Sequence, residues 1–175
     1  EERSSAMAKA RWNVAQRPEE TSLAPTTKVV LVASGKGGVG KSSVTTNLAV
    51  ALAQRGHRVL IVDADLGGAN VHTVLGVPPP LATLSDFITK GKALDEVAVQ
   101  TPFANLMLLS GALDDIDAAN PQYHQKMRLL RHLHTFDTDF MVLDLGAGTA
   151  FNIVDFFLIA DLRILVARPE PTSVE

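Results

Sequence analysis

The sequence has no cysteine among its 175 residues. Disulfide bonds, cysteine-ligated zinc and cysteine-ligated iron–sulfur clusters are therefore excluded for this chain, which is compatible with a cytosolic setting. Positive charge is not in excess either. The formal net charge is −3, which gives no support for a strongly basic nucleic-acid surface. No apolar stretch approaches the roughly 18 residues of a membrane-spanning helix, and no signal peptide is visible.

Apolar residues, by contrast, make up 46% of the chain, which is typical of a globular α/β protein and not of a disordered one. The length suffices for one domain with a substantial core. Residues 1–27 are polar and carry Pro18 and Pro25, so we expect a flexible N-terminal leader there. The folded domain is expected over residues 28–175.

Strand and helix patterns alternate along that domain. Unbroken apolar runs predict strands at residues 28–33, 58–63, 106–109, 140–144 and 162–167. Helical spacing predicts helices at residues 43–55, 84–89, 121–136 and 152–159. Strands that are apolar on both faces belong to parallel sheets covered by helices. The alternation therefore predicts a doubly wound, mostly parallel α/β sheet.

A glycine-rich loop between the first predicted strand and helix is the most informative motif. It reads Gly35-Lys36-Gly37-Gly38-Val39-Gly40-Lys41-Ser42 and matches the phosphate-loop pattern G-x-x-x-x-G-K-[ST]. Its glycines let backbone N–H groups converge on the α- and β-phosphates of a nucleotide. Lys41 is expected to reach the β/γ-phosphates, and the Ser42 hydroxyl to bind Mg²⁺. The strand–loop–helix order supports a real phosphate site.

A second lysine, Lys36, lies inside this loop. Because Lys41 occupies the phosphate position, Lys36 can reach outward to a nucleotide held by a second subunit. There it would add positive charge where the transition state spreads negative charge, as an arginine finger does. A solvated loop lysine is the alternative, and spacing alone favours that alternative.

Three aspartates, Asp63, Asp65 and Asp144, lie at the carboxyl ends of predicted strands, the edge where open α/β sheets bind ligands. Asp144 precedes glycines, as a Walker B acid does, and is expected to hold Mg²⁺ directly or through a water. A solvated acid at a strand end is the alternative. Gly148 has no side chain, so its N–H can approach a γ-phosphate closely.

Asp63 and Asp65 flank Ala64, and period-two geometry puts their side chains on one face while the strand persists. Either can position the attacking water or support the metal's water shell. We favour Asp65 as the residue that positions the attacking water and Asp63 as the one that supports the metal's water shell. The alternative that Asp63 caps the following turn remains open.

These arguments define three overlapping sets of site residues. The predicted catalytic residues are Lys36, Lys41 and Asp65. The predicted metal ligands are Ser42, Asp65 and Asp144. The predicted nucleotide-binding residues are Gly35, Lys36, Gly37, Gly38, Val39, Gly40, Lys41, Ser42, Ser43, Asp63 and Gly148.

Four ordered motifs together resemble the MinD/ParA family of P-loop ATPases, whose Walker A motif is deviant. They are the phosphate loop with Asn47-Leu48-Ala49, then Val62-Asp63-Ala64-Asp65-Leu66-Gly67-Gly68-Ala69-Asn70, Leu143-Asp144-Leu145-Gly146-Ala147-Gly148, and Pro169-Glu170-Pro171-Thr172-Ser173. Within the family the chain looks most like the MinD-like branch that contains flagellar-number regulators. The family core continues beyond the last residue here, so we expect its C-terminal part, with the adenine contacts, to be absent.

The resemblance implies an ATP-dependent homodimer in which Lys36 of one subunit contacts the phosphates of the other, and this favours a functional Lys36. It implies slow, Mg²⁺-dependent ATP hydrolysis used as a switch in the spatial positioning of a division, flagellar or chromosome-partition structure. It also implies a regulatory protein that stimulates hydrolysis. A cytoplasmic location follows, and peripheral association with the inner face of the cell membrane is compatible with it. Nucleic acid is the less favoured partner.

Other functions share this fold. An ATP-dependent ligase resembling dethiobiotin synthetase needs a substrate pocket beside the γ-phosphate, and residues 66–76 suggest no dedicated ligands for one. A metal-cluster carrier is disfavoured by the lack of cysteine. A bacterial tyrosine kinase is disfavoured because Tyr123 is the single tyrosine. A binding module without hydrolysis stays open.

The helix predicted at residues 121–136 is rich in basic side chains. They are His124, Lys126, Arg128, Arg131, His132 and His134. A solvated outer face is the preferred interpretation, and a contact with DNA the alternative.

Overall fold

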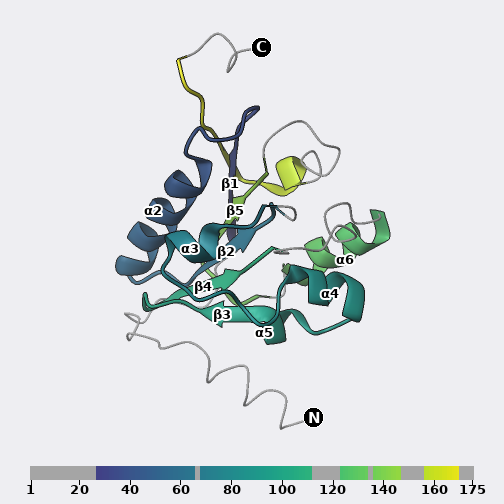
Figure 1. Ribbon diagram of the computed structural model, residues 1–175. Coiled ribbons are helices and arrows are strands. Elements are labelled where there is room, and N and C mark those ends of the chain that lie inside the picture. Colours follow the sequence, from purple (N-terminus) through teal and green to yellow (C-terminus); the bar gives the residue numbers. More distant parts are fainter. Residues whose placement is uncertain (1–26, 66–67, 112–122, 134–135, 147–155, 170–175) are drawn as a thin grey trace.

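The computed structural model describes residues 27–65, 68–111, 123–133, 136–146 and 156–169 (Figure 1). Nearly all of the predicted leader, residues 1–27, lies outside these ranges, and so does Gly148. Among the described residues, none of the helices has the length and apolar character needed to cross a membrane.

A six-stranded sheet forms the centre of the described structure, in the order β3-β4-β2-β5-β1-β6. The strands are β1 Lys28–Ala33, β2 Val59–Asp63, β3 Ala98–Gln100, β4 Leu106–Leu109, β5 Phe140–Asp144 and β6 Leu162–Leu165. All neighbours run parallel except β3, which is antiparallel to β4. The mostly parallel α/β sheet predicted from the alternating pattern is thereby confirmed.

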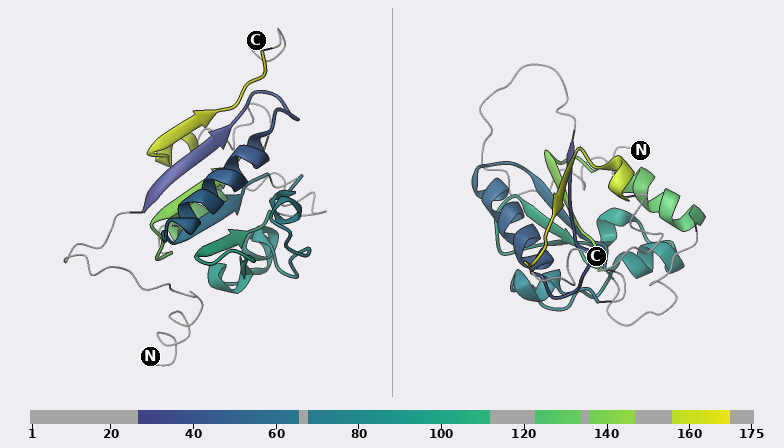
Figure 2. Two further views of the ribbon diagram at one scale, coloured as in Figure 1. Left: turned by 90° about the vertical axis from the view of Figure 1, so that its left-hand side faces the viewer. Right: turned by 90° about the horizontal axis from the view of Figure 1, so that it is seen from above.

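Helices cover both faces of this sheet. They are α2 Lys41–Gln54, α3 Val71–Val74, α4 Leu84–Lys90, α5 Leu94–Val97 and α6 Tyr123–Leu133, and residues 156–159 are also helical. Seen from above in Figure 2, α2 lies on one side of the sheet and α4 and α6 on the other. Side chains alternate between the two faces: Val59 and Ile61 join the core under α2, whereas Leu60 and Val62 join the core under α4 and α6.

The structure adds elements that sequence patterns did not predict. Helix α5 and strand β3 lie between α4 and β4. Strand β3 has only three residues, too few for an alternation signal, and a turn with Asn105 at a φ of 61° leads into β4. Strand β6 ends at Leu165 and not at residue 167. Helix α2 starts at Lys41, two residues earlier than predicted.

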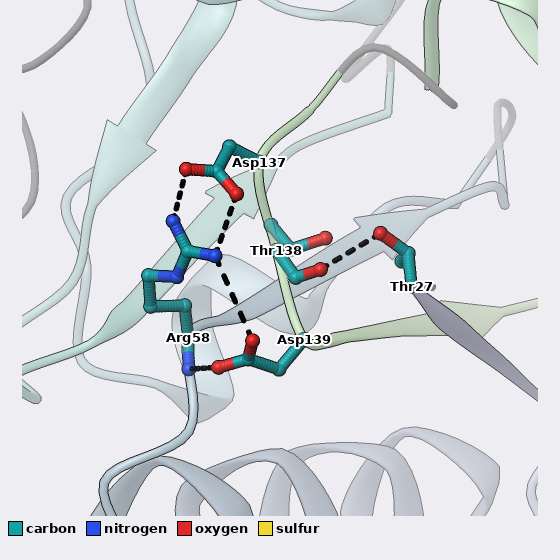
Figure 3. Close-up of polar contacts among 5 residues, drawn as sticks. All are labelled: Thr27, Arg58, Asp137, Thr138 and Asp139. Carbon is teal, nitrogen blue, oxygen red and sulfur yellow. Dashed lines mark hydrogen bonds and ion pairs between the residues drawn. The ribbon is translucent and has the colours of Figure 1, made fainter. Parts of the chain in front are cut away.

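The starts of the three central strands are tied together by polar contacts (Figure 3). The Arg58 guanidinium, at the start of β2, hydrogen-bonds the Asp137 carboxylate, with Nη2 2.6 Å from Oδ1. The Arg58 backbone N–H donates to Asp139 Oδ2 at 2.8 Å, just before β5. Thr27 Oγ1, just before β1, donates to the Thr138 carbonyl at 2.7 Å. These contacts hold the register that brings the carboxyl ends of β1, β2 and β5 together at the opposite edge.

Candidate functional site

The glycine loop occupies the predicted position between β1 and α2. Gly38 and Gly40 have φ angles of +73° and +97°, a region that side chains other than glycine rarely adopt. Gly40 immediately precedes the first residue of α2, and its carbonyl accepts the Val44 N–H at 3.0 Å. The two glycines are therefore required by the backbone that turns the loop into the helix.

Open space borders this loop. A Cβ atom added at Gly35, Gly38 or Gly40 would meet nothing within 4 Å. Because α2 begins at the loop, its first N–H groups have no partner within the helix and are available to an anion. The loop backbone therefore meets the requirements for holding phosphate groups.

The two lysines of the loop have different environments. Lys41, in the first turn of α2, is only 8% exposed, an unusually low value for a lysine. Burial raises the pKa of the nearby Asp144, and the positive charge of Lys41 opposes that rise. Lys36 is exposed, and its backbone N–H donates to Ser34 Oγ at 3.2 Å. The predicted contact of Lys36 with a second subunit would form only in a dimer, so it remains a prediction.

Asp144 ends β5, between β1 and β2, and is 2% exposed. Thr45 Oγ1 donates to Asp144 Oδ1 at 3.0 Å. Burial raises the pKa of Asp144, while hydrogen bonds from Ser42 and Thr45 and the charge of Lys41 oppose that rise. Two hydroxyl groups and a lysine, all from the first two turns of α2, therefore surround one buried carboxylate.

Asp63 ends β2 and is completely buried. Its Oδ1 accepts the Asp65 N–H at 3.2 Å, and its Oδ2 accepts the Val71 N–H at 3.1 Å. Burial raises the pKa of Asp63 to about 7, because the two backbone hydrogen bonds only partly offset the loss of water. Both carboxylate oxygens thus hold the loop that follows β2, as in the capping alternative considered from the sequence.

Asp65 lies beyond the end of β2, so the condition for placing it on one strand face with Asp63 is not met. Its carboxylate instead approaches the glycine after β5: a Cβ atom added at Gly146 would be 3.2 Å from Asp65 Oδ1. The charge of Asp65 contributes to the raised pKa values of Asp63 and Asp144. All three predicted acids therefore meet at one edge of the sheet.

Two further residues shape this edge. Thr45 was not predicted from the sequence, although it lies four residues after Lys41 and therefore on the same side of α2. Gly111, after β4, packs against the Asp65 loop: a Cβ atom there would be 2.8 Å from the Asp63 carbonyl oxygen. This close approach excludes any larger residue at that position without a shift of the backbone.

The site can supply oxygen ligands to a hard cation. The Ser42 hydroxyl and the Asp144 carboxylate are oxygen donors of the kind that Mg²⁺ prefers. Among the residues that the structure describes, no group of three or more histidines and acids could hold a metal alone.

Comparison with known proteins gives the same fold. Residues 25–175 match the ParA family model, described as NUBPL iron-transfer P-loop NTPase. The antiactivator FleN of Pseudomonas aeruginosa is 36% identical over 148 residues, 84% of this chain and 52% of FleN. The septum site-determining protein MinD of Pyrococcus horikoshii, complexed with Mg-ADP, is 34% identical with a TM-score of 0.75, over 85% of this chain and 60% of that one.

A second solved relative is the MinC:MinD cell division protein complex of Aquifex aeolicus. It is 27% identical with a TM-score of 0.68, over 85% of this chain and 59% of that one. The chain spans about half the length of the curated relatives that it matches.

Proposed function

Because the chain belongs to the ParA family of P-loop NTPases, in its MinD-like branch, we propose that it is an ATP-dependent switch. The switch dimerises with Mg-ATP and hydrolyses it slowly to control the position of a cellular structure. The observation that carries this proposal is the buried pair of Lys41 and Asp144 beneath an open glycine loop. A buried lysine and a buried acid next to unsatisfied N–H groups are suited to a magnesium–phosphate ligand.

The phosphate groups would lie against the N–H groups of residues 35–43, with the Lys41 ammonium on the β- and γ-phosphates. The Mg-ADP complex of the P. horikoshii relative supports this class of ligand. Ser42 and Asp144 would hold Mg²⁺, with Asp65 close enough to the same edge to contribute. The bound ion would neutralise negative charge that develops during phosphoryl transfer.

Hydrolysis requires a water held in line with the γ-phosphate. We assign its orientation to Asp65, whose carboxylate lies beside the backbone of Gly146, just after β5. Asp63 would act through Asp65, since its Oδ1 accepts the Asp65 N–H at 3.2 Å and fixes the start of that loop. Asp63 is thus proposed as a positioning residue and Asp65 as a catalytic one.

Dimerisation would bring Lys36 of one subunit to the nucleotide of the other. The exposure of Lys36 beside the buried Lys41 supports this division of roles. The MinC:MinD complex supports a regulatory protein as the further partner. We place the action of the protein in the cytoplasm, with peripheral association at the inner face of the cell membrane, as for a MinD-like protein.

Sedimentation of the full-length protein with ADP and with a non-hydrolysable ATP analogue tests this proposal. We expect a monomer with Mg-ADP and a dimer with the Mg-analogue. The Lys41→Ala variant is the control and should stay monomeric with both nucleotides. Identical sedimentation of the wild-type protein with both nucleotides would refute the switch.

A metal-cluster carrier is a second candidate, favoured by the iron-transfer description of the matched family model. Against it, the chain has no cysteine, so it offers no thiolate to a cluster. Anaerobic reconstitution with iron and sulfide distinguishes the two functions. A visible absorption band that resists gel filtration would favour the carrier, and its absence would favour the switch.

A further inference from the structure

Helix α6 presents an exposed basic face on the side of the molecule opposite to α2. We define the basic α6 face by its four exposed side chains, His124, Arg128, Arg131 and His132. They follow helical spacing and gather on one side of α6. The apolar residues Leu129, Leu130 and Leu133 are buried and fix the helix to the sheet. The whole of α6 contains no acidic residue.

Contacts with α4 hold two of these side chains in place. The Arg128 guanidinium carbon lies 4.6 Å from the ring centroid of Phe87, over its face. The His132 ring meets the same Phe87 edge-on, with ring centroids 5.3 Å apart. The stacked guanidinium is thus oriented before any partner arrives, which lowers the entropy lost on binding. Figure 1 shows α4 and α6 side by side.

The two arginines of this face have no acidic partner among the residues that the structure describes. On the neighbouring helix α4, the Asp86 carboxylate already pairs with Lys90 at 2.7 Å. For Arg128 and Arg131, no ion pair is found within the described residues. A helix stabilised by its own surface charges would instead alternate acids and bases three or four residues apart. The two exposed guanidinium groups therefore offer an external anion positive charge on one side of α6.

We propose that the basic α6 face docks an acidic segment of a partner protein. A guanidinium fork binds carboxylates in a bidentate manner, and Arg128 presents such a fork on a rigid ring. Nucleic acid is the weaker match, because the chain carries a net charge of −3. The proposal does not depend on nucleotide binding, since α6 and α2 lie on opposite faces of the sheet.

The test is a titration of the ¹⁵N-labelled full-length protein with an oligo-glutamate peptide, followed by amide chemical shifts. A second sample contains Mg-ADP, so that a peptide that merely occupies the phosphate loop is displaced. We expect saturable shifts at residues 124–132 in both samples. The peptide-induced shifts on α6 should appear even if the nucleotide does not bind. A failure of the proposed ATPase function would therefore not be mistaken for a failure of this proposal.

Charge-reversed variants locate the binding surface. Arg131→Glu should weaken peptide affinity about fivefold, since exposed charge pairs contribute up to ~1 kcal/mol each. Arg55→Glu changes the net charge equally at an exposed position at the end of α2 and should bind as the wild type does. Equal weakening in both variants would overturn the proposal, and so would peptide shifts confined to other residues. Stronger Arg131-dependent binding of a DNA duplex or of anionic vesicles than of the peptide would also overturn it.

Discussion

Replacing Arg58 with methionine should destabilise the protein at the edge of the sheet remote from the nucleotide site. Methionine keeps the unbranched part of the largely buried side chain, about as far as Nε, but removes the guanidinium that contacts Asp137 and Asp139 (Figure 3). The hydrogen bond with Asp137 raises the pKa of Arg58, so the guanidinium is charged at every pH of interest. The substitution therefore tests charge pairing with little loss of volume.

The magnitude follows from the exposure of each partner. The Asp137 side chain is 80% exposed, so solvent screens its pair with Arg58, which contributes about 0.5 to 1 kcal/mol. The Asp139 side chain is 11% exposed and lies 3.6 Å from Arg58 Nη2, so its pair contributes roughly another 1 kcal/mol. Arg58 Nε is buried and has no hydrogen-bond partner among the described residues, so its removal offsets part of the loss. The free energy of unfolding should fall by about 1 to 2 kcal/mol.

Urea unfolding, followed by circular dichroism, measures this change. For a domain of this size the thermal midpoint should fall by about 4 °C. Lys28→Met is the matched control, because Lys28 faces Asp161 at 4.0 Å with both side chains about half exposed, and its loss should cost less than about 0.5 kcal/mol. Equal stability of the two variants would refute the assignment of the Arg58 contacts as structural.

The remaining predictions concern the site. Lys36→Ala should bind nucleotide as the wild type does but lose dimerisation with an ATP analogue; unchanged sedimentation would reject the contact across subunits. Asp65→Ala should lower the rate of phosphate release at least tenfold and trap the ATP form, whereas wild-type turnover would remove Asp65 from the mechanism. Because burial raises the pKa of Asp63 from 3.8 to about 7, the folded protein retains a proton that the unfolded chain releases. The free energy of unfolding should therefore fall between about pH 4 and pH 7, and less steeply in Asp63→Asn; equal slopes in urea titrations would contradict this assignment.

The central strands and the phosphate loop could be predicted because their signals are local. Strands β1 and β5 have the predicted bounds, since each is a continuous apolar run buried between two layers. The loop backbone requires glycine at positions 38 and 40 because both φ angles are positive, so the glycine pattern of the motif predicts this conformation. Thr45 could have been found by the same reasoning, because it follows Lys41 by one turn of helix.

Other features depend on tertiary contacts, so local sequence patterns could not predict them. Strand β3 exists because β4 offers it an antiparallel edge, and three residues carry no periodic signal of their own. The orientation of the Asp63 carboxylate depends on the turn after β2, which brings the Val71 N–H back to within 3.1 Å. The approach of Asp65 to Gly146 joins two loops 81 positions apart, so only the folded sheet brings them together.

Calorimetric titration with a non-hydrolysable Mg-ATP analogue tests the central claim most directly. The wild-type protein should release heat in a saturable manner with one nucleotide per chain, and Lys41→Ala should give no measurable binding, because Lys41 is the buried cation under the loop. Equal affinity in the two proteins would contradict the assignment of residues 35–43 as the phosphate site.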